Sequence, residues 1–316
     1  YIHHKSMEFQ KFINKLNKDG SVWKPADIVA LSGLTKHEIK QFKLVWPKLT
    51  TIKKYDLVEQ LIDLEKDSAS VDFSSVLISC IHDDDIGIRK ASLIGLSQCE
   101  DRSLIKPLIE IIENDASYEI RIAAIIAISG FVTMYQAGKL GSGDFEKIRK
   151  CLFTILSERE DHIEVQCRAI EVVGGILDSS TESIIKDAYG SGVLELKKSS
   201  IRAMALTSDI KWVQLIIDDM EDQSAEIRYE SVTTAGMVGD ETIVPYLIDL
   251  LQDDDSDVQL AAISSLGMIG GMIAKMALNK CLEVDDFREA AELALGNIAF
   301  DDDPMGVNMM RDDSNF

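Results

Sequence analysis

Chemistry in this chain would have to come from its five histidines and five cysteines, which are common nucleophiles, bases and metal ligands in proteins. His162 precedes Cys167 by five residues, a spacing that turns the two side chains to different faces of a helix. The histidines are dispersed, and the chain has no glycine-rich phosphate loop. The sequence therefore predicts no catalytic residue, no metal site and no bound cofactor.

The net charge of −21 is distributed unevenly. Residues 1–54 contain eleven lysines and four acidic residues, so the acidic excess lies in the rest of the chain. An acidic body repels nucleic acid and anionic membranes over most of its surface. The basic segment either offsets the acidic body or contacts a partner. Opposite charges at the two ends also allow head-to-tail association between copies.

The five cysteines are scattered and never form a Cys-x-x-Cys pair, as is typical of a reducing compartment. No uninterrupted apolar run reaches the roughly 18 residues of a membrane span. The amino terminus lacks an apolar signal core. We therefore expect a cytoplasmic protein without a membrane span. We also expect residues 1–6 to be a remnant before a natural start at Met7.

One pattern recurs seven times, at spacings of 29 to 45 residues. The residue before each marker position is apolar, the residues three and eight positions after it are small, and the residue seven after it is apolar. The marker residues are Arg89, Arg121, Gln166, Lys197, Arg228, Gln259 and Arg288.

These offsets predict the second helix of a repeated helix pair. Positions one before, three after and seven after the marker share one side of a helix, so they form a buried stripe. Small residues let the neighbouring helix approach closely. In five repeats an acid stands six positions before the marker, where it can accept N–H groups at the start of the helix. These acids are Asp83, Asp115, Glu160, Asp222 and Asp253.

The segments 253–270 and 226–240 resemble the HEAT-like repeat first associated with phycobilisome lyases. The resemblance covers about residues 74–299. It implies an all-α fold, a right-handed α-α superhelix (a HEAT-like solenoid) of about seven helix pairs plus an N-terminal helical cap. Gln166 and Gln259 replace the arginine that is usual at the marker, so an Asp–Arg ladder between repeats should be interrupted there.

The resemblance leaves function open, because this family includes scaffolds, chaperone-like binders and a few enzymes. Relatives that oxidise a lysine derivative bind iron through several His-Glu pairs, and this chain has only His37-Glu38. A bilin lyase or isomerase component is implied by the resemblance alone. We therefore expect a non-enzymatic protein.

We expect three regions, with boundaries at residues 73 and 300. Residues 1–73 form a basic N-terminal helical capping region in which Thr35 and Glu38 have capping-box form. Residues 74–300 form the repeat array, with a loop inserted near 136–145 because glycine and serine cluster there. Residues 301–316 form an acidic mobile tail.

The capping region also has a sharper interpretation, a helix-turn-helix that binds nucleic acid. Val29 argues against it, since the motif usually has Ala or Gly at that place. The hydrophobic positions of the motif would be Ile28, Leu34, Ile39 and Phe42, and Gly33 would lie at the turn. The lysines that would face phosphates are Lys36, Lys40 and Lys43.

A partner would contact the variable positions of the second helices. An apolar section followed by a basic section would suit an amphipathic or acidic helix. Alternatively, Ile94 and Ile126 pack against the cap or the inserted loop. Our leading hypothesis is a scaffold or adaptor that binds another protein or peptide on its concave surface. The predicted strip comprises Ile94, Ile122, Ile126, Arg168, Lys198, Arg202 and Tyr229.

Overall fold

The computed structural model describes residues 2–16, 18, 22–157 and 161–302. These residues form eighteen α-helices and no strand, which confirms the all-α class. The chain divides into two compact units, residues 1–172 and residues 173–316, called here the amino-terminal and carboxyl-terminal units. The expected tail beyond Asp302 lies outside the described residues.

The amino-terminal unit begins with four helices that precede the repeats. Thr35 and Glu38 form the expected capping box at the start of α3. Helix α4 packs on α6, and α3 packs on α5, so this region covers the first repeat. The bounds are α1 Ile2–Leu16, α2 Pro25–Ile28, α3 Lys36–Val45 and α4 Thr51–Asp67.

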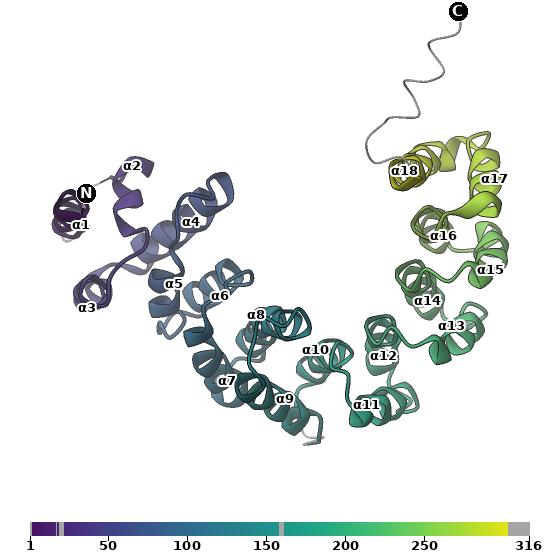
Figure 1. The fold of residues 1–316 in the computed structure, drawn as a ribbon, viewed down its shortest axis with the longest axis horizontal. Helices are drawn as coiled ribbons and strands as arrows, with labels where there is room; N and C mark the ends of the chain where they lie inside the picture. Colours follow the sequence, from purple (N-terminus) through teal and green to yellow (C-terminus); the bar gives the residue numbers. More distant parts are fainter. Residues whose placement is uncertain (1, 17, 19–21, 158–160, 303–316) are drawn as a thin grey trace, which may run out of the picture. The chain divides into compact units, whose positions relative to one another are not determined.

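Three helix pairs follow in this unit, and in Figure 1 their first and second helices form two rows. Each second helix packs on the previous one, as α6 does on α4 and α8 does on α6. The pairs are α5 Ser74–Cys80 with α6 Ile86–Gly95, α7 Ile105–Asn114 with α8 Tyr118–Gln136, and α9 Ser142–Ser157 with α10 Ile163–Val173.

The carboxyl-terminal unit contains four more pairs, which confirms the expected total of seven. The second helices again pack in sequence, α12 on α14, α14 on α16 and α16 on α18. The pairs are α11 Ser179–Tyr189 with α12 Leu194–Leu206, α13 Val213–Asp219 with α14 Ala225–Val238, α15 Val244–Asp249 with α16 Ser256–Ile269, and α17 Gly271–Cys281 with α18 Asp285–Asp302.

The buried stripe predicted from the repeat is present in both units. The small residue three positions after the marker is buried in all seven repeats, from Ser92 in α6 to Ala291 in α18. Glycine eight positions after the marker brings the backbones close in the carboxyl-terminal unit. A Cβ atom built on Gly267 would lie 2.7 Å from the Cβ of Ala294 on the next second helix. This approach is closer than any larger side chain permits.

The acids in the turns act in two ways. The Asp253 carboxylate accepts the N–H of Asp255, two residues on, and it pairs with Arg228 of the preceding repeat at 2.7 Å. Asp222 does the same with the N–H of Ser224 and with Lys197. Each acid therefore closes its own turn and joins two repeats.

The predicted interruptions of this ladder are also observed. Within the described residues, Gln166 and Gln259 donate to backbone carbonyls of their own turns, those of Asp161 and Asp253, and not to an acid of the next repeat. In the amino-terminal unit Asp161 pairs with Arg121. The predicted acid Glu160 lies outside the described residues.

The loop predicted near 136–145 corresponds to a shorter connection in the structure, residues 137–141. Helix α8 runs to Gln136 and α9 begins at Ser142, so the extra residues mostly lengthen two helices. Gly138 has a φ of 71°, and the N–H of Lys139 donates to the carbonyl of Met134, which together end α8. The rings of Tyr135 and Phe145 stack 3.7 Å apart across the short connection. Glycine here marks a helix end rather than a long loop.

Helix α8 is also the only helix in the described part of the chain with the length and composition to cross a membrane. It has 19 residues, and Glu119 and Arg121 lie in its first turns. The helix packs against α6, α7 and α9 and buries a row of apolar side chains from Ile120 to Val132. These contacts are those of a core helix in the repeat array.

Candidate functional site

The predicted strip is divided between the two units. Ile94, Ile122, Ile126 and Arg168 belong to the amino-terminal unit. Lys198, Arg202 and Tyr229 belong to the carboxyl-terminal unit. A continuous strip therefore stays a prediction, and each group is described within its own unit.

The three isoleucines line one hollow of about 450 Å³ between α6 and α8. Ile94 is 56% exposed and Ile126 is 42% exposed, so neither the cap nor the inserted segment covers them. They point outward because they stand five positions after their markers, opposite the buried stripe. We call Ile94, Ile122, Ile126 and Tyr118, which also lines the hollow, the isoleucine groove.

Polar groups border the isoleucine groove at the start of its helices. Lys90 pairs with Glu119 at 3.1 Å, and both side chains are about half exposed. The ring of Tyr118 stacks on His162 at 3.9 Å. His162 therefore supports the Tyr118 side of the groove by packing against its ring. The sequence prediction missed Tyr118, which could have been found as the first residue of α8.

Each basic residue of the predicted strip forms an ion pair with a nearby acid. Lys198 on α12 pairs with Glu226 at 2.6 Å, and Arg202 pairs with Glu230. Both acids lie on α14, on the next second helix. Arg168 pairs with Glu171 one turn further along α10, at 2.6 Å. These pairs reduce the attraction that the basic residues would have for an acidic partner.

A second hollow, of about 710 Å³, lies over α14 and α16 in the carboxyl-terminal unit. Tyr229 and Leu260 stand one position after their markers and are 42% and 40% exposed. Glu226 and Asp257 stand two positions before the same markers and border the hollow. We call Tyr229, Leu260, Glu226 and Asp257 the acidic groove.

The acidic row beside this groove was present in the sequence but not recognised. An acid stands two positions before the marker in six of the seven repeats. In the first turn of a helix such an acid complements the positive end of the helix dipole. The acids are Glu119, Glu164, Glu195, Glu226, Asp257 and Asp286.

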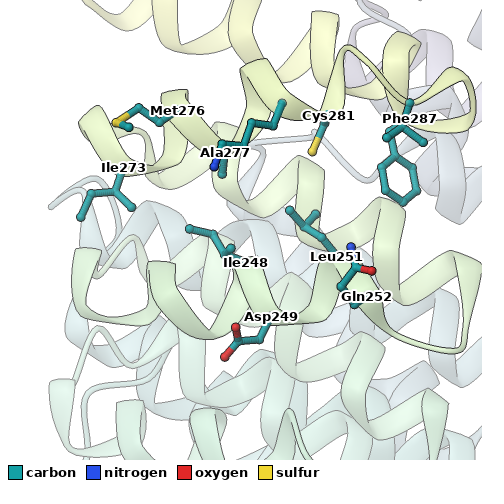
Figure 2. Close-up of a pocket in the computed structure, with 11 residues that line it drawn as sticks. Ile248, Asp249, Leu251, Gln252, Ile273, Met276, Ala277, Cys281 and Phe287 are labelled. Atoms are coloured by element: carbon teal, nitrogen blue, oxygen red, sulfur yellow. The ribbon is translucent and has the colours of Figure 1, made fainter.

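A third hollow, of about 680 Å³, lies on the first-helix side of the carboxyl-terminal unit. Figure 2 shows Ile248 and Leu251 on one side and Ile273, Met276 and Ala277 of α17 on the other. Ile273 and Met276 are exposed. This hollow is mainly apolar, and Asp249, Lys280 and Cys281 are the ionisable residues of its lining.

The cysteine thiols are poorly suited to nucleophilic chemistry. Burial raises the pKa of Cys80 and of Cys151 to about 12, so both thiols stay protonated at neutral pH. Within the described ranges, no group of three His, Cys, Asp or Glu side chains is placed to hold a metal ion.

One partly buried cluster of ionisable groups joins two repeats. Lys197 pairs with Asp219 and Asp222 at 2.8 Å each, and the hydroxyl of Tyr189 donates to Asp219. Burial by itself lowers the pKa of Lys197, but hydrogen bonds to the two carboxylates raise it overall. Burial, assisted by Asp219, raises the pKa of Tyr189 to about 12. The cluster forms part of the ladder and leaves Lys197 fully charged.

Comparison with known proteins supports the repeat. Residues 210–296 match the family model described as HEAT repeats, which confirms the resemblance proposed from the repeat pattern. The matched residues lie within the carboxyl-terminal unit. No curated protein sequence matches the chain.

Several solved helical-repeat proteins are similar to this chain at low identity. The complex of CpcE and CpcF of phycocyanin lyase from Nostoc sp. PCC7120 is 13% identical, with 89% of this chain and 97% of that chain covered and a TM-score of 0.48. Human deoxyhypusine hydroxylase is 15% identical, with 94% and 98% covered and a TM-score of 0.33. A designed armadillo repeat protein is 16% identical, with 62% and 99% covered and a TM-score of 0.35.

Proposed function

We propose that this chain is a non-catalytic scaffold that binds another protein through the second-helix faces of its repeats. The observation that carries the proposal is the isoleucine groove. Three isoleucines from two successive repeats face one hollow, and two of them are substantially exposed. A contiguous apolar patch with a polar border is typical of a protein-binding surface.

The partner that suits this groove is an amphipathic helix. The hollow runs between two helices, a geometry that accepts apolar side chains spaced three and four residues apart. Covering the exposed part of each isoleucine would contribute about 1 kcal/mol. Lys90 and Glu119, already paired at the border, can hydrogen-bond to polar residues that flank the apolar side chains.

Capture from native extract tests the proposal. Wild-type chain is compared with the double variant Ile94→Asp, Ile126→Asp, and bound proteins are identified and then rebound in purified form. The double variant should lose the partner, because two carboxylates would be buried in an apolar contact. Circular dichroism checks that the variant is folded, as expected for two exposed positions.

The matched control carries Ile52→Asp and Leu177→Asp, which also replace exposed apolar side chains, at 83% and 82% exposure. This control should retain the partner. If the control and the groove variant lose it equally, the isoleucine groove is not the binding site. If the purified partner binds both variants as tightly as wild type, the proposal fails.

A further inference from the structure

Helix α3 carries a row of exposed lysines. Lys36, Lys40 and Lys43 follow one another at helical spacing along α3, with Leu44 beside the last of them. All three lysines are exposed, and Leu44 is 71% exposed. Within the described parts of the chain, no carboxylate pairs with any of the three. We call these four residues the lysine stripe.

The opposite face of α3 explains why the stripe is held in a fixed position. Phe42 and Val45 are buried, and Phe42 packs against Trp46 with ring centroids 5.3 Å apart. The capping box at Thr35 and Glu38 fixes the start of the helix. Packing on one side and exposure on the other therefore present three charges and one apolar side chain in a rigid row.

The acidic groove offers complementary chemistry. Tyr229 and Leu260 form its apolar floor, and Asp257 borders it as an exposed carboxylate. Glu226 is already paired with Lys198, but no cation in the described ranges pairs with Asp257 or with Asp286, its equivalent in the next repeat. Between residues 225 and 302 the chain has sixteen acidic and only four basic residues.

The Asp257 carboxylate is not used to cap the start of α16. The carboxylate of Asp255 already accepts the N–H groups of Asp257 and Val258 and so caps the helix. The Asp257 carboxylate is thus available to a cation from outside. A neutral or acidic segment laid on Tyr229 and Leu260 would desolvate this carboxylate without a partner, which is costly.

We propose that the acidic groove of one copy binds the lysine stripe of a second copy. Leu44 inserts between Tyr229 and Leu260, while the lysines pair with Asp257 and Asp286. The inference rests on the proposed function in that both assign protein binding to second-helix faces. Because the two surfaces differ, each added copy offers a new free stripe, so the contact builds a head-to-tail series of copies or a closed ring.

Sedimentation velocity on the full chain tests this inference. At low salt the wild-type chain should associate more strongly as its concentration rises. The association should weaken by about tenfold or more near 0.5 M salt, because the contact depends on exposed charges. A chain that remains monomeric at all concentrations in low salt overturns the proposal.

Charge reversal locates the contact. The stripe variant carries Lys40→Glu and Lys43→Glu. The groove variant carries Asp257→Lys in the acidic groove and Asp286→Lys at the equivalent position of the next repeat. Each variant alone should be monomeric, because like charges now face each other. An equimolar mixture of the two should associate again, since each stripe then meets a groove of opposite charge.

A matched control separates this contact from general charge effects. Asp218→Lys with Glu221→Lys makes the same change in net charge at two exposed positions outside the groove. This control should associate like wild type. If it dissociates as the groove variant does, or if the mixture stays monomeric while both variants are folded, the proposed contact is wrong. All these outcomes are independent of the capture test at Ile94 and Ile126.

Discussion

The amino-terminal unit presents Ile94, Ile122 and Ile126 on its second helices, whereas the carboxyl-terminal unit presents Tyr229 and Leu260 beside carboxylates. Both sets occupy equivalent positions one to five residues after the marker. The buried side of the same helices is alike in the two units, with a small residue three positions after each marker. The repeat thus fixes the packing and leaves the exposed positions free to differ.

A second difference lies in how closely neighbouring second helices approach. The carboxyl-terminal unit has glycine eight positions after the marker at Gly236 and Gly267, and both have a next-helix atom within 2.7 Å of a built Cβ. The amino-terminal unit has Ser97 and Ser129 at the equivalent positions. The nearest atom to a Cβ on its Gly130 is a carbonyl oxygen at 3.5 Å. Packing tolerance should therefore differ between Gly267 and Gly130.

The largest effect should come from the ladder that both units share. Asp83→Ala in the amino-terminal unit removes the partner of Lys54 and Trp46, and Asp253→Ala in the carboxyl-terminal unit removes the partner of Arg228. Each change should lower the free energy of unfolding by about 3 kcal/mol, because a mostly buried cation loses its counter-ion. Urea denaturation followed by circular dichroism measures this.

The control for the ladder is Asp63→Ala, which removes an exposed pair with Lys66. It should change the free energy of unfolding by less than about 0.5 kcal/mol. Equal, large losses in the free energy of unfolding for Asp83→Ala and Asp253→Ala would establish that the same ion-pair ladder stabilises both units. A large loss at only one of them would break that part of the comparison.

Replacing glycine by alanine should have opposite effects at Gly267 and at Gly130. Gly267→Ala in α16 forces a methyl group against Ala294 and should destabilise the chain by about 1–3 kcal/mol. Gly130→Ala in α8 meets only an ordinary contact and should stabilise it by up to about 1 kcal/mol, since alanine favours the helix. Thermal unfolding of both variants measures the sign. Destabilisation of equal size at both positions would contradict the difference in packing.

The smallest effect on the free energy of unfolding should come from a change in pH, and it should develop gradually. Hydrogen bonds and the charge of Arg228 lower the pKa of Asp253 below its ordinary value of 3.8. Burial by itself raises the pKa of Asp83, but hydrogen bonds from Lys54, Asp85 and Trp46 lower it overall. A lowered pKa in the folded state means that the ionised form stabilises the fold. This contribution is fully present well above pH 3.8 and is lost as the pH falls through the lowered pKa.

Urea denaturation between about pH 5 and pH 2.5 should therefore show a falling free energy of unfolding below pH 3.8. Asp253→Asn should flatten part of that fall, since an amide does not titrate in this range. A fall of unchanged steepness in this variant would exclude Asp253 as a contributor.

The helix pairs and their buried stripe could be predicted because they depend on local spacing. The offsets around markers such as Arg228 repeat with the period of a helix, and burial follows from that period. The turn acids could be predicted as helix-start residues for the same reason. For the ion pairs between repeats, such as Arg228 with Asp253, the sequence predicted only that an Asp–Arg ladder would be interrupted at two positions. It did not predict the individual pairs.

The candidate site was predicted less completely. Exposure of Ile94 and Ile126 depends on whether another segment covers them, which spacing does not determine. The neutralisation of Lys198 and Arg202 depends on which acids the next repeat brings into reach. The role of Lys54 as the first cation of the ladder was missed because residues 8–73 lack the repeat pattern, although α4 packs on α6 like any other second helix.

The sequence by itself determined the all-α class, the seven helix pairs and the residues that must be buried, because periodicity and side-chain size act within one or two helical turns. Only the tertiary structure decided that a short connection, residues 137–141, separates α8 from α9, that the isoleucines line an open hollow and that Asp257 pairs with no cation in the described ranges. These outcomes depend on contacts between residues about 25 to 45 positions apart, such as Arg102 with Asp144 and Lys198 with Glu226. Local spacing carries no information about such distances, and stacking of one repeat on the next sets them.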